Sequence, residues 1–157
     1  YEWASRTDFP LRRAPTAVGY SNKDIHFCWL KAIYRNGSIG GVRKSVVEDE
    51  KAQQILDQEE VIFATISVFD AGTKLNPHRD PPVYGRKYRR VQIPLYIPSD
   101  KCYMVWKGKK VFWKEGEPQV YDVMDHIHEG YNLSDDIMMF LFVDIEKRDD
   151  NSNLQEV

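Results

Sequence analysis

The stretch VIFATISVFDAGTKLNPHRDP, residues 61–81, begins like a strand and ends in a histidine and an aspartate between two prolines. Its first ten residues are rich in β-branched and aromatic side chains, which favour strands. In extended backbone, residues i and i+2 project from the same face. His78 and Asp80 can therefore approach one point in space, as two ligands of a metal site would. Taken alone the pair is a weak signal, because a polar turn would also use Asp and Pro.

Four later segments have the same composition and are separated by Gly, Pro, Asp and Asn, which are typical of turns. They are YRRVQIPLYIP (88–98), CYMVWKGKKVFW (102–113), PQVYDVMD (118–125) and IMMFLFVDIE (137–146). The second of these segments is predicted to be a hairpin around Gly108. Several short strands after one helical segment predict a mainly β fold, either a sandwich or a jelly-roll barrel.

The chain of 157 residues is predicted to be a single domain, with an N-terminal arm and helix in 1–60 and a jelly-roll core in 61–147. Residues 1–22 hold two prolines and scattered charges and are expected to form an irregular arm, and 24–34 is a mixed apolar segment. Residues 45–60 are rich in helix formers and are predicted to form a helix. Its expected apolar face consists of Val46, Ala52, Ile55 and Leu56.

The composition narrows the class of protein. A hydrophobic share of 42% and an aromatic share of 13% fit a folded chain, and a net charge of -2 gives no reason to expect nucleic acid or an anionic membrane as partner. The basic run RKYRR (86–90) is predicted to be a solvated loop or strand edge, from which single arginines can still point inward. No apolar run approaches the roughly 20 residues that span a bilayer. Cys28 and Cys102 lack framework spacing, which favours reduced thiols in the cytoplasm, with one disulfide as the alternative.

A site of two histidines and one carboxylate leaves open positions on Fe(II) for substrate and dioxygen, so His78 and Asp80 need one more histidine. Of the four histidines in the chain, His26 lies far upstream and is expected to be packed or on the surface. His126 and His128 lie in MDHIHEGYN, just before the last apolar segment, which a jelly roll can place beside an early strand. Alternation puts both on one face, so the spacing alone does not choose between them.

Several segments occur in an order that resembles the aspartyl/asparaginyl β-hydroxylase family, over roughly residues 61–147: SVFDAGTKLNPHRD, RRVQIPLYIP, WKEGEPQVYD and HEGYN, followed by VDI. That family belongs to the Fe(II)- and 2-oxoglutarate-dependent oxygenases. The resemblance implies a double-stranded β-helix. It also implies decarboxylation of 2-oxoglutarate, coupled to hydroxylation by dioxygen of an amino-acid residue or a small amino-acid-like substrate. The family's distal ligand opens an H-E-x-aromatic-N motif, so the resemblance implies His78, Asp80 and His128 as the iron ligands, with His126 beside them.

The resemblance also implies contacts with the co-substrate. Ser67 matches a family serine before the first histidine, and Arg90 matches an arginine that opens the following strand, with Arg89 as its neighbour if the register slips. Gln92 stands where the family often has a second co-substrate residue, a histidine. Met138 stands where the family usually carries the arginine that binds the distal carboxylate of 2-oxoglutarate. Arg90 is the leading substitute for that charge. The alternatives are a different placement of the co-substrate and its loss.

Asp80 groups the chain with family members that have a complete triad, among them small free-amino-acid hydroxylases, whereas the human-type branch has glycine there. Whether the substrate is a peptide or a small molecule stays open. Two rival classes remain: a cupin-like protein, because HIHE (126–129) resembles the H-x-H of a cupin motif, and a non-catalytic binding module, which the methionine at position 138 supports. The aromatic residues that either line a cavity or pack in the core are Trp106, Trp113, Tyr96 and Tyr131.

Overall fold

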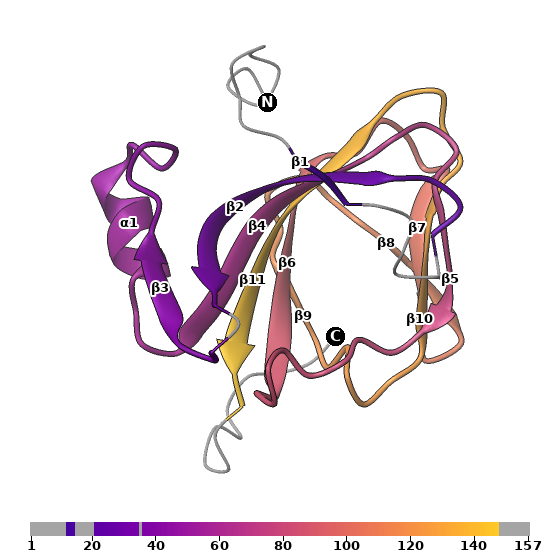
Figure 1. Cartoon of the computed structure of the whole chain (residues 1–157). Coiled ribbons are helices and arrows are strands. Elements are labelled where there is room, and N and C mark those ends of the chain that lie inside the picture. Colours follow the sequence, from indigo (N-terminus) through magenta and orange to yellow (C-terminus); the bar gives the residue numbers. More distant parts are fainter. Residues whose placement is uncertain (1–11, 15–20, 35, 148–157) are drawn as a thin grey trace.

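The structure is a computed structural model that describes residues 12–14, 21–34 and 36–147. Its strands form two antiparallel sheets that face each other (Figure 1). The larger sheet has the order β1 (Arg12–Ala14), β2 (Ile25–Ile33), β4 (Val61–Phe69), β11 (Met138–Glu146), β6 (Tyr88–Tyr96) and β9 (Gln119–Tyr121), with β3 (Ile39–Val42) beside β2. The smaller sheet has the order β5 (Lys74–His78), β10 (His128–Asn132), β7 (Cys102–Trp106) and β8 (Lys109–Phe112). The predicted mainly β, jelly-roll fold is confirmed.

The hairpin predicted around Gly108 joins β7 to β8, and Trp106 pairs with Lys109 across its two-residue turn. Both turn residues have positive φ, 49° at Lys107 and 77° at Gly108. This combination matches the right-handed twist of the paired strands and favours glycine in the second position. Each of the other predicted strand segments likewise contains a strand of the structure.

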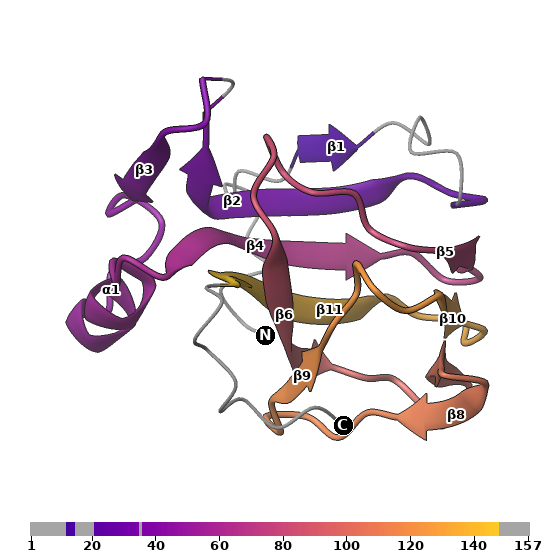
Figure 2. The same cartoon turned by 90° about the horizontal axis from the view of Figure 1, so that it is seen from below.

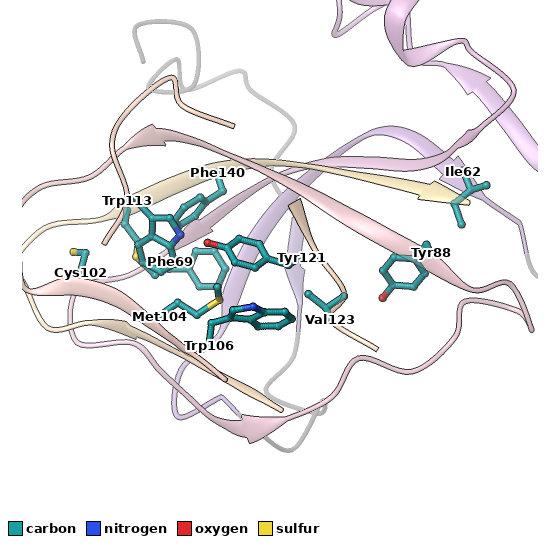
Figure 3. Close-up of a cluster of buried hydrophobic side chains, with 11 residues drawn as sticks. Ile62, Phe69, Tyr88, Cys102, Met104, Trp106, Trp113, Tyr121, Val123 and Phe140 are labelled. Atoms are coloured by element: carbon teal, nitrogen blue, oxygen red, sulfur yellow. The ribbon is translucent and has the colours of Figure 1, made fainter. Parts of the chain in front are cut away.

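Strands β4 and β11 lie in the middle of the larger sheet and are buried on both faces, which explains their nearly continuous apolar sequences. Between the sheets, aromatic rings meet edge to face (Figure 3). The ring centroid of Phe140 lies 5.9 Å from that of Phe69 and 4.8 Å from that of Trp113. Both cysteines, Cys28 and Cys102, are buried and free, so the alternative of a disulfide is not found.

Helix α1 (Glu50–Leu56) is shorter than the predicted helix over 45–60. Asp49 caps it by accepting a hydrogen bond from the backbone N–H of Ala52 at 2.7 Å. Leu56 is buried, but Ile55 is 60% exposed, so the predicted apolar face was wrong at that position. No helix in the described part of the chain is long and apolar enough to cross a membrane.

Helix α1 covers the outer face of the larger sheet, at the end of the molecule opposite β5 and β10 (Figure 2). Leu56 packs there in one cluster with Ala64 and Ile66 of β4. The buried ammonium group of Lys31 donates hydrogen bonds to the backbone oxygens of Leu56 (2.8 Å) and Gln58 (3.0 Å), which ties the end of the helix to β2. The helix therefore covers the barrel from outside and does not enter its interior.

The apolar segment 24–34 forms β2, which pairs with β4 from Ile25 opposite Phe69 onward. The larger sheet thus extends beyond the predicted core of 61–147. Within the predicted arm of 1–22, Arg12–Ala14 forms β1 against β2, whereas residues 1–11 and 15–20 lie outside the described residues.

Asn132 ends the HEGYN motif, and its fully buried side chain joins two turns, the one after β4 and the one before β11. Its Nδ2 donates to the backbone oxygens of Phe69 (3.1 Å), Asp70 (3.0 Å) and Asp136 (2.8 Å), and its Oδ1 accepts from the Ser134 hydroxyl (2.6 Å). Asn132→Ala leaves these buried groups without their partner. We expect it to lower the free energy of unfolding by about 3 kcal/mol, since each buried unsatisfied group costs roughly 1–3 kcal/mol.

Urea denaturation followed by circular dichroism measures this difference. The matched control is Asn36→Ala, because the Asn36 side chain accepts a hydrogen bond from Ser38 in an exposed turn. There water replaces the lost bond, and we expect a change of less than about 1 kcal/mol. Equal losses in the two variants would show that Asn132 does not organise the turns around it.

Candidate metal centre

The two histidines at the centre of the site are cross-strand neighbours. His78 is the last residue of β5 and His128 the first of β10, and the antiparallel register places them directly opposite each other. Their ring centroids lie 4.3 Å apart. The jelly roll thus brings a late strand beside an early one (Figure 1), so that residues far apart in the sequence lie next to each other.

Asp80 follows β5 and completes the group. Its backbone N–H donates to the oxygen of Val123 at 3.0 Å, which fixes the loop after the strand. Its Oδ1 lies 3.4 Å from Nε2 of His78 and 3.7 Å from Nε2 of His128. One donor atom from each residue lies within 4.8 Å of the other two, close enough for a single ion to contact all three. The donor set, two imidazoles and one carboxylate, fits Fe(II) with open positions.

Backbone carbonyls orient both imidazoles. Nδ1 of His78 lies 2.6 Å from the oxygen of Asn76, and Nδ1 of His128 lies 3.2 Å from the oxygen of His126. Because a carbonyl oxygen only accepts, each Nδ1 carries the hydrogen in these bonds. Each Nε2 then faces Asp80 and, in the neutral form of the ring, carries the lone pair that a metal-ligating imidazole requires.

The remaining histidines lie away from this group. The ring of His126 packs edge-on against Trp106, with the centroids 5.4 Å apart. Nε2 of His26 lies 3.4 Å from Oδ2 of Asp70. Among the described residues, the structure therefore brings His128 rather than His126 to His78 and Asp80.

The charges of the group suit a metal. Burial by itself raises the pKa of Asp80, but Arg90 and the two histidines outweigh burial and hold this pKa well below its ordinary value. Burial lowers the pKa of His128. An ionised carboxylate and a neutral imidazole are thus both favoured, and these are the forms that bind a metal.

Arg90 connects the metal group to the larger sheet. Its Nη1 donates to Oδ2 of Asp80 at 2.6 Å, while its Nε and Nη2 donate to the two carboxylate oxygens of Asp144 at 2.8 and 2.9 Å. Arg90 and Asp144 are cross-strand neighbours on β6 and β11. The bond to Oδ2 leaves Oδ1 of Asp80 facing the histidines. Arg90 is thus an inward-pointing arginine of the basic run 86–90.

Asp144 is a part of the site that the sequence predictions missed. It is almost fully buried, and burial raises the pKa of its carboxyl group, whereas the two bonds from Arg90 favour the ionised form. Its signal in the sequence is a single acidic residue in the otherwise apolar run FLFVDI. A buried charge needs a partner, and the partner is Arg90.

A cavity of about 370 Å³ opens between the sheets beside these residues. The predicted metal ligands line it, and so do the predicted co-substrate residues Ser67, Arg90 and Gln92. Met138 lines it as well, almost fully buried, opposite Phe69 on β4. The structure therefore collects every predicted site residue around one space.

The wall of the larger sheet that faces the cavity is mostly aromatic. Ser67 lies between Phe27 on β2 and Phe140 on β11, and Gln92 lies opposite Phe142. Among the described residues that line the cavity, Arg90 is the one arginine or lysine. Since Arg90 is already bonded to two carboxylates, the lining does not match the second carboxylate of 2-oxoglutarate.

Further cavity residues come from β2, which the sequence predictions left outside the core: Ile25, Phe27 and Trp29. Of the four aromatic residues considered from the sequence, Trp113 lines the cavity. Trp106 belongs to the buried core, Tyr131 stacks on Tyr103, and the Tyr96 hydroxyl donates to Asp136 at 2.9 Å.

Two solved structures have similar folds over 90% of this chain. One is a 2OG-Fe(II) oxygenase family oxidoreductase from Burkholderia pseudomallei, with 12% identity, a TM-score of 0.63 and 76% of that chain covered. The other is described as a "predicted oxalate decarboxylase" from Thermotoga maritima, with 13% identity, a TM-score of 0.55 and 96% of that chain covered. At these identities the similarity shows the shared fold alone.

No curated protein matches the sequence. The sequence model of the family described as "Aspartyl/Asparaginyl beta-hydroxylase" matches residues 34–148, which include most of the described strands and helix α1. This match covers more of the chain than the motifs noted in the sequence, since it begins before the predicted helix. The chain belongs to the aspartyl/asparaginyl β-hydroxylase family.

Proposed function

We propose that this protein is a mononuclear Fe(II) oxygenase that hydroxylates an amino-acid residue or a small amino-acid-like substrate, with dioxygen and a 2-oxo acid as co-substrates. The observation that carries the proposal is the convergence of His78, Asp80 and His128, with both Nε2 atoms directed at Asp80. Membership of a hydroxylase family supports an oxygenase-type reaction. 2-Oxoglutarate, which the sequence resemblance implies, is one member of the 2-oxo acid class.

The overall reaction balances with one 2-oxo acid for each hydroxylation. The 2-oxo acid loses its carboxyl group as CO2 and becomes the carboxylic acid that is one carbon shorter. One oxygen atom of O2 enters that acid and the other enters the product hydroxyl, while the 2-oxo acid and the substrate C–H bond give two electrons each. When bound, Fe(II) supplies open coordination positions and the electron transfers that dioxygen requires.

The residues of the chain position the reactants and limit access of water. The carbonyl of Asn76 holds the His78 ring, and Arg90 holds the Asp80 carboxylate, so these donor atoms are in place before an ion binds. The aromatic wall of the larger sheet gives the cavity an apolar surface that excludes water. We assign Ser67 and Gln92 to contacts with the bound co-substrate, because both are polar side chains that face this cavity.

Two other classes of protein, a cupin-like protein and a non-catalytic binding module, would give experimental results different from those of an oxygenase. A cupin-like site built on an H-x-H pair would use the imidazoles of both His126 and His128, but the His126 ring lies against Trp106. A non-catalytic binding module would bind a metal and transfer no oxygen. Product analysis separates the oxygenase from both classes.

The test of this function is the transfer of labelled oxygen. We expect Fe(II)-loaded protein, supplied with a set of 2-oxo acids and a panel of free amino acids and peptides under ¹⁸O2, to yield a product with one ¹⁸O atom. Mass spectrometry locates the label, and His78→Ala, which removes one of the two imidazole ligands, is the inactive control. If Fe(II) binds and no member of the panel gains the label, the protein is not a hydroxylase of this substrate class.

A further inference from the structure

The charges of a divalent metal, Asp80, Arg90 and Asp144 together leave one positive charge for an anion to balance. Arg90 and Asp144 form a bidentate pair at 2.8 and 2.9 Å, and their opposite charges cancel. A divalent ion with the Asp80 carboxylate has a net charge of +1. One carboxylate of a co-substrate balances that charge. A second carboxylate in the cavity finds no unpaired cation among the described lining residues.

The wall around Ser67 is uncharged. Its cross-strand neighbours are Phe27 and Phe140, and Met138 and Phe69 form the next pair on the same face of the sheet. All five residues line the cavity. A carboxylate beside the Ser67 hydroxyl would lose its hydration against phenyl rings and a thioether, which is costly without a cation. An apolar or aromatic group fits the same surface and gains from burial there.

Resting on the proposed function, we propose that the co-substrate is a 2-oxo acid with a single carboxylate and an apolar side chain, branched or aromatic, rather than the dicarboxylate 2-oxoglutarate. Its 2-oxo acid end lies at the metal and its apolar end lies against the wall formed by Phe27, Phe140 and Met138. The reaction is the one balanced above. The carboxylic acid that it releases carries the same apolar side chain.

Anaerobic titration of the Fe(II)-loaded protein tests the proposal by binding alone. Chelation of Fe(II) by a 2-oxo acid gives a weak visible charge-transfer band, and its growth with concentration gives a Kd. The probes are 2-oxoglutarate, its 5-methyl ester, 4-methyl-2-oxopentanoate and phenylpyruvate. The ester has the chain of 2-oxoglutarate without the second charge, so this pair isolates the effect of the distal carboxylate.

We expect the ester and at least one of the two apolar acids to bind at least about tenfold more tightly than 2-oxoglutarate, because the second carboxylate is desolvated without a partner. Equal or tighter binding of 2-oxoglutarate overturns the inference and leaves the proposed function standing. If Fe(II) binds and no probe produces the band, the proposed function fails, and the inference fails with it.

Met138→Arg places a cation on the wall beside Ser67. We expect this variant to bind 2-oxoglutarate at least about tenfold more tightly than the wild type does, and to lose affinity for 4-methyl-2-oxopentanoate. A folded variant without this reversal contradicts the assignment of the wall to the far end of the co-substrate. Met138 is almost fully buried, so circular dichroism must first show that the variant folds. If the variant does not fold, the titration of the wild-type protein decides the proposal.

Discussion

Replacing either His78 or His128 with alanine is expected to lower the affinity for Fe(II) at least about 100-fold. Each substitution removes one of the two imidazoles whose Nε2 atoms lie 3.4 and 3.7 Å from Asp80. The described part of the chain offers no third imidazole to this group, since the His126 ring packs on Trp106 and His26 lies beside Asp70. The two single variants should therefore lose similar amounts of affinity.

Anaerobic competition against a coloured chelator measures these affinities, and circular dichroism checks that the variants fold. His126→Ala is the matched control, because it removes an imidazole two residues from a ligand and leaves the backbone carbonyl that orients His128. We expect this control to change the affinity for Fe(II) less than threefold. A loss in His126→Ala as large as that in His128→Ala would indicate a cupin-like H-x-H site.

The largest change in stability is expected for Arg90→Met, which should lower the free energy of unfolding by about 3–5 kcal/mol. Methionine fills much of the same space but leaves the carboxylate of Asp144, which is 1% exposed, without its two charge-assisted hydrogen bonds. Asp80 loses its bond from Nη1 as well. Removing one partner of a buried ion pair costs far more than the pair contributes, because an uncompensated charge stays behind.

Urea denaturation of the metal-free protein measures this effect against two matched variants. Arg86→Met removes an arginine that pairs with Glu146 at 2.6 Å near the surface, where we expect a loss of about 1 kcal/mol or less. Arg90→Met combined with Asp144→Leu removes both charges of the buried pair and should recover most of the lost stability. If the double variant is as unstable as Arg90→Met, the cause is lost packing around Arg90, and the buried charge of Asp144 is not responsible.

Much of the fold and of the candidate site could be predicted from the sequence, because the signals for strands, turns and ligand spacing lie in short segments. The β-branched and aromatic runs after Val61 predict strands whether or not their partners are known, and Gly108 marks its hairpin by the positive φ that the turn requires. The i, i+2 spacing of His78 and Asp80 predicts a shared face. Spacing alone left His126 and His128 equivalent, and the family motif favoured His128, the residue that the register places opposite His78.

The features that the sequence did not predict depend on contacts between distant residues, which no local pattern encodes. Strand β2 has a mixed sequence because His26 and Lys31 stand among its apolar residues, and their partners, Asp70 and the backbone at the end of helix α1, lie elsewhere in the chain. Helix α1 has only seven residues, too few for its periodicity to show that Ile55 points to solvent. Asp144 is recognisable as part of the site only once the register places it opposite Arg90.

With Fe(II) held by His78, Asp80 and His128, the proposed reaction would consume one O2 and release one CO2 for each 2-oxo acid. The most direct measurement is the consumption of O2 and the release of CO2 by Fe(II)-loaded protein supplied with each 2-oxo acid probe. We expect at least one probe to support both, with O2 consumed and CO2 released in a ratio near one to one when the substrate is present, and His78→Ala to support neither. If Fe(II)-loaded wild-type protein consumes no O2 with any probe, the protein is not an oxygenase that uses these 2-oxo acids.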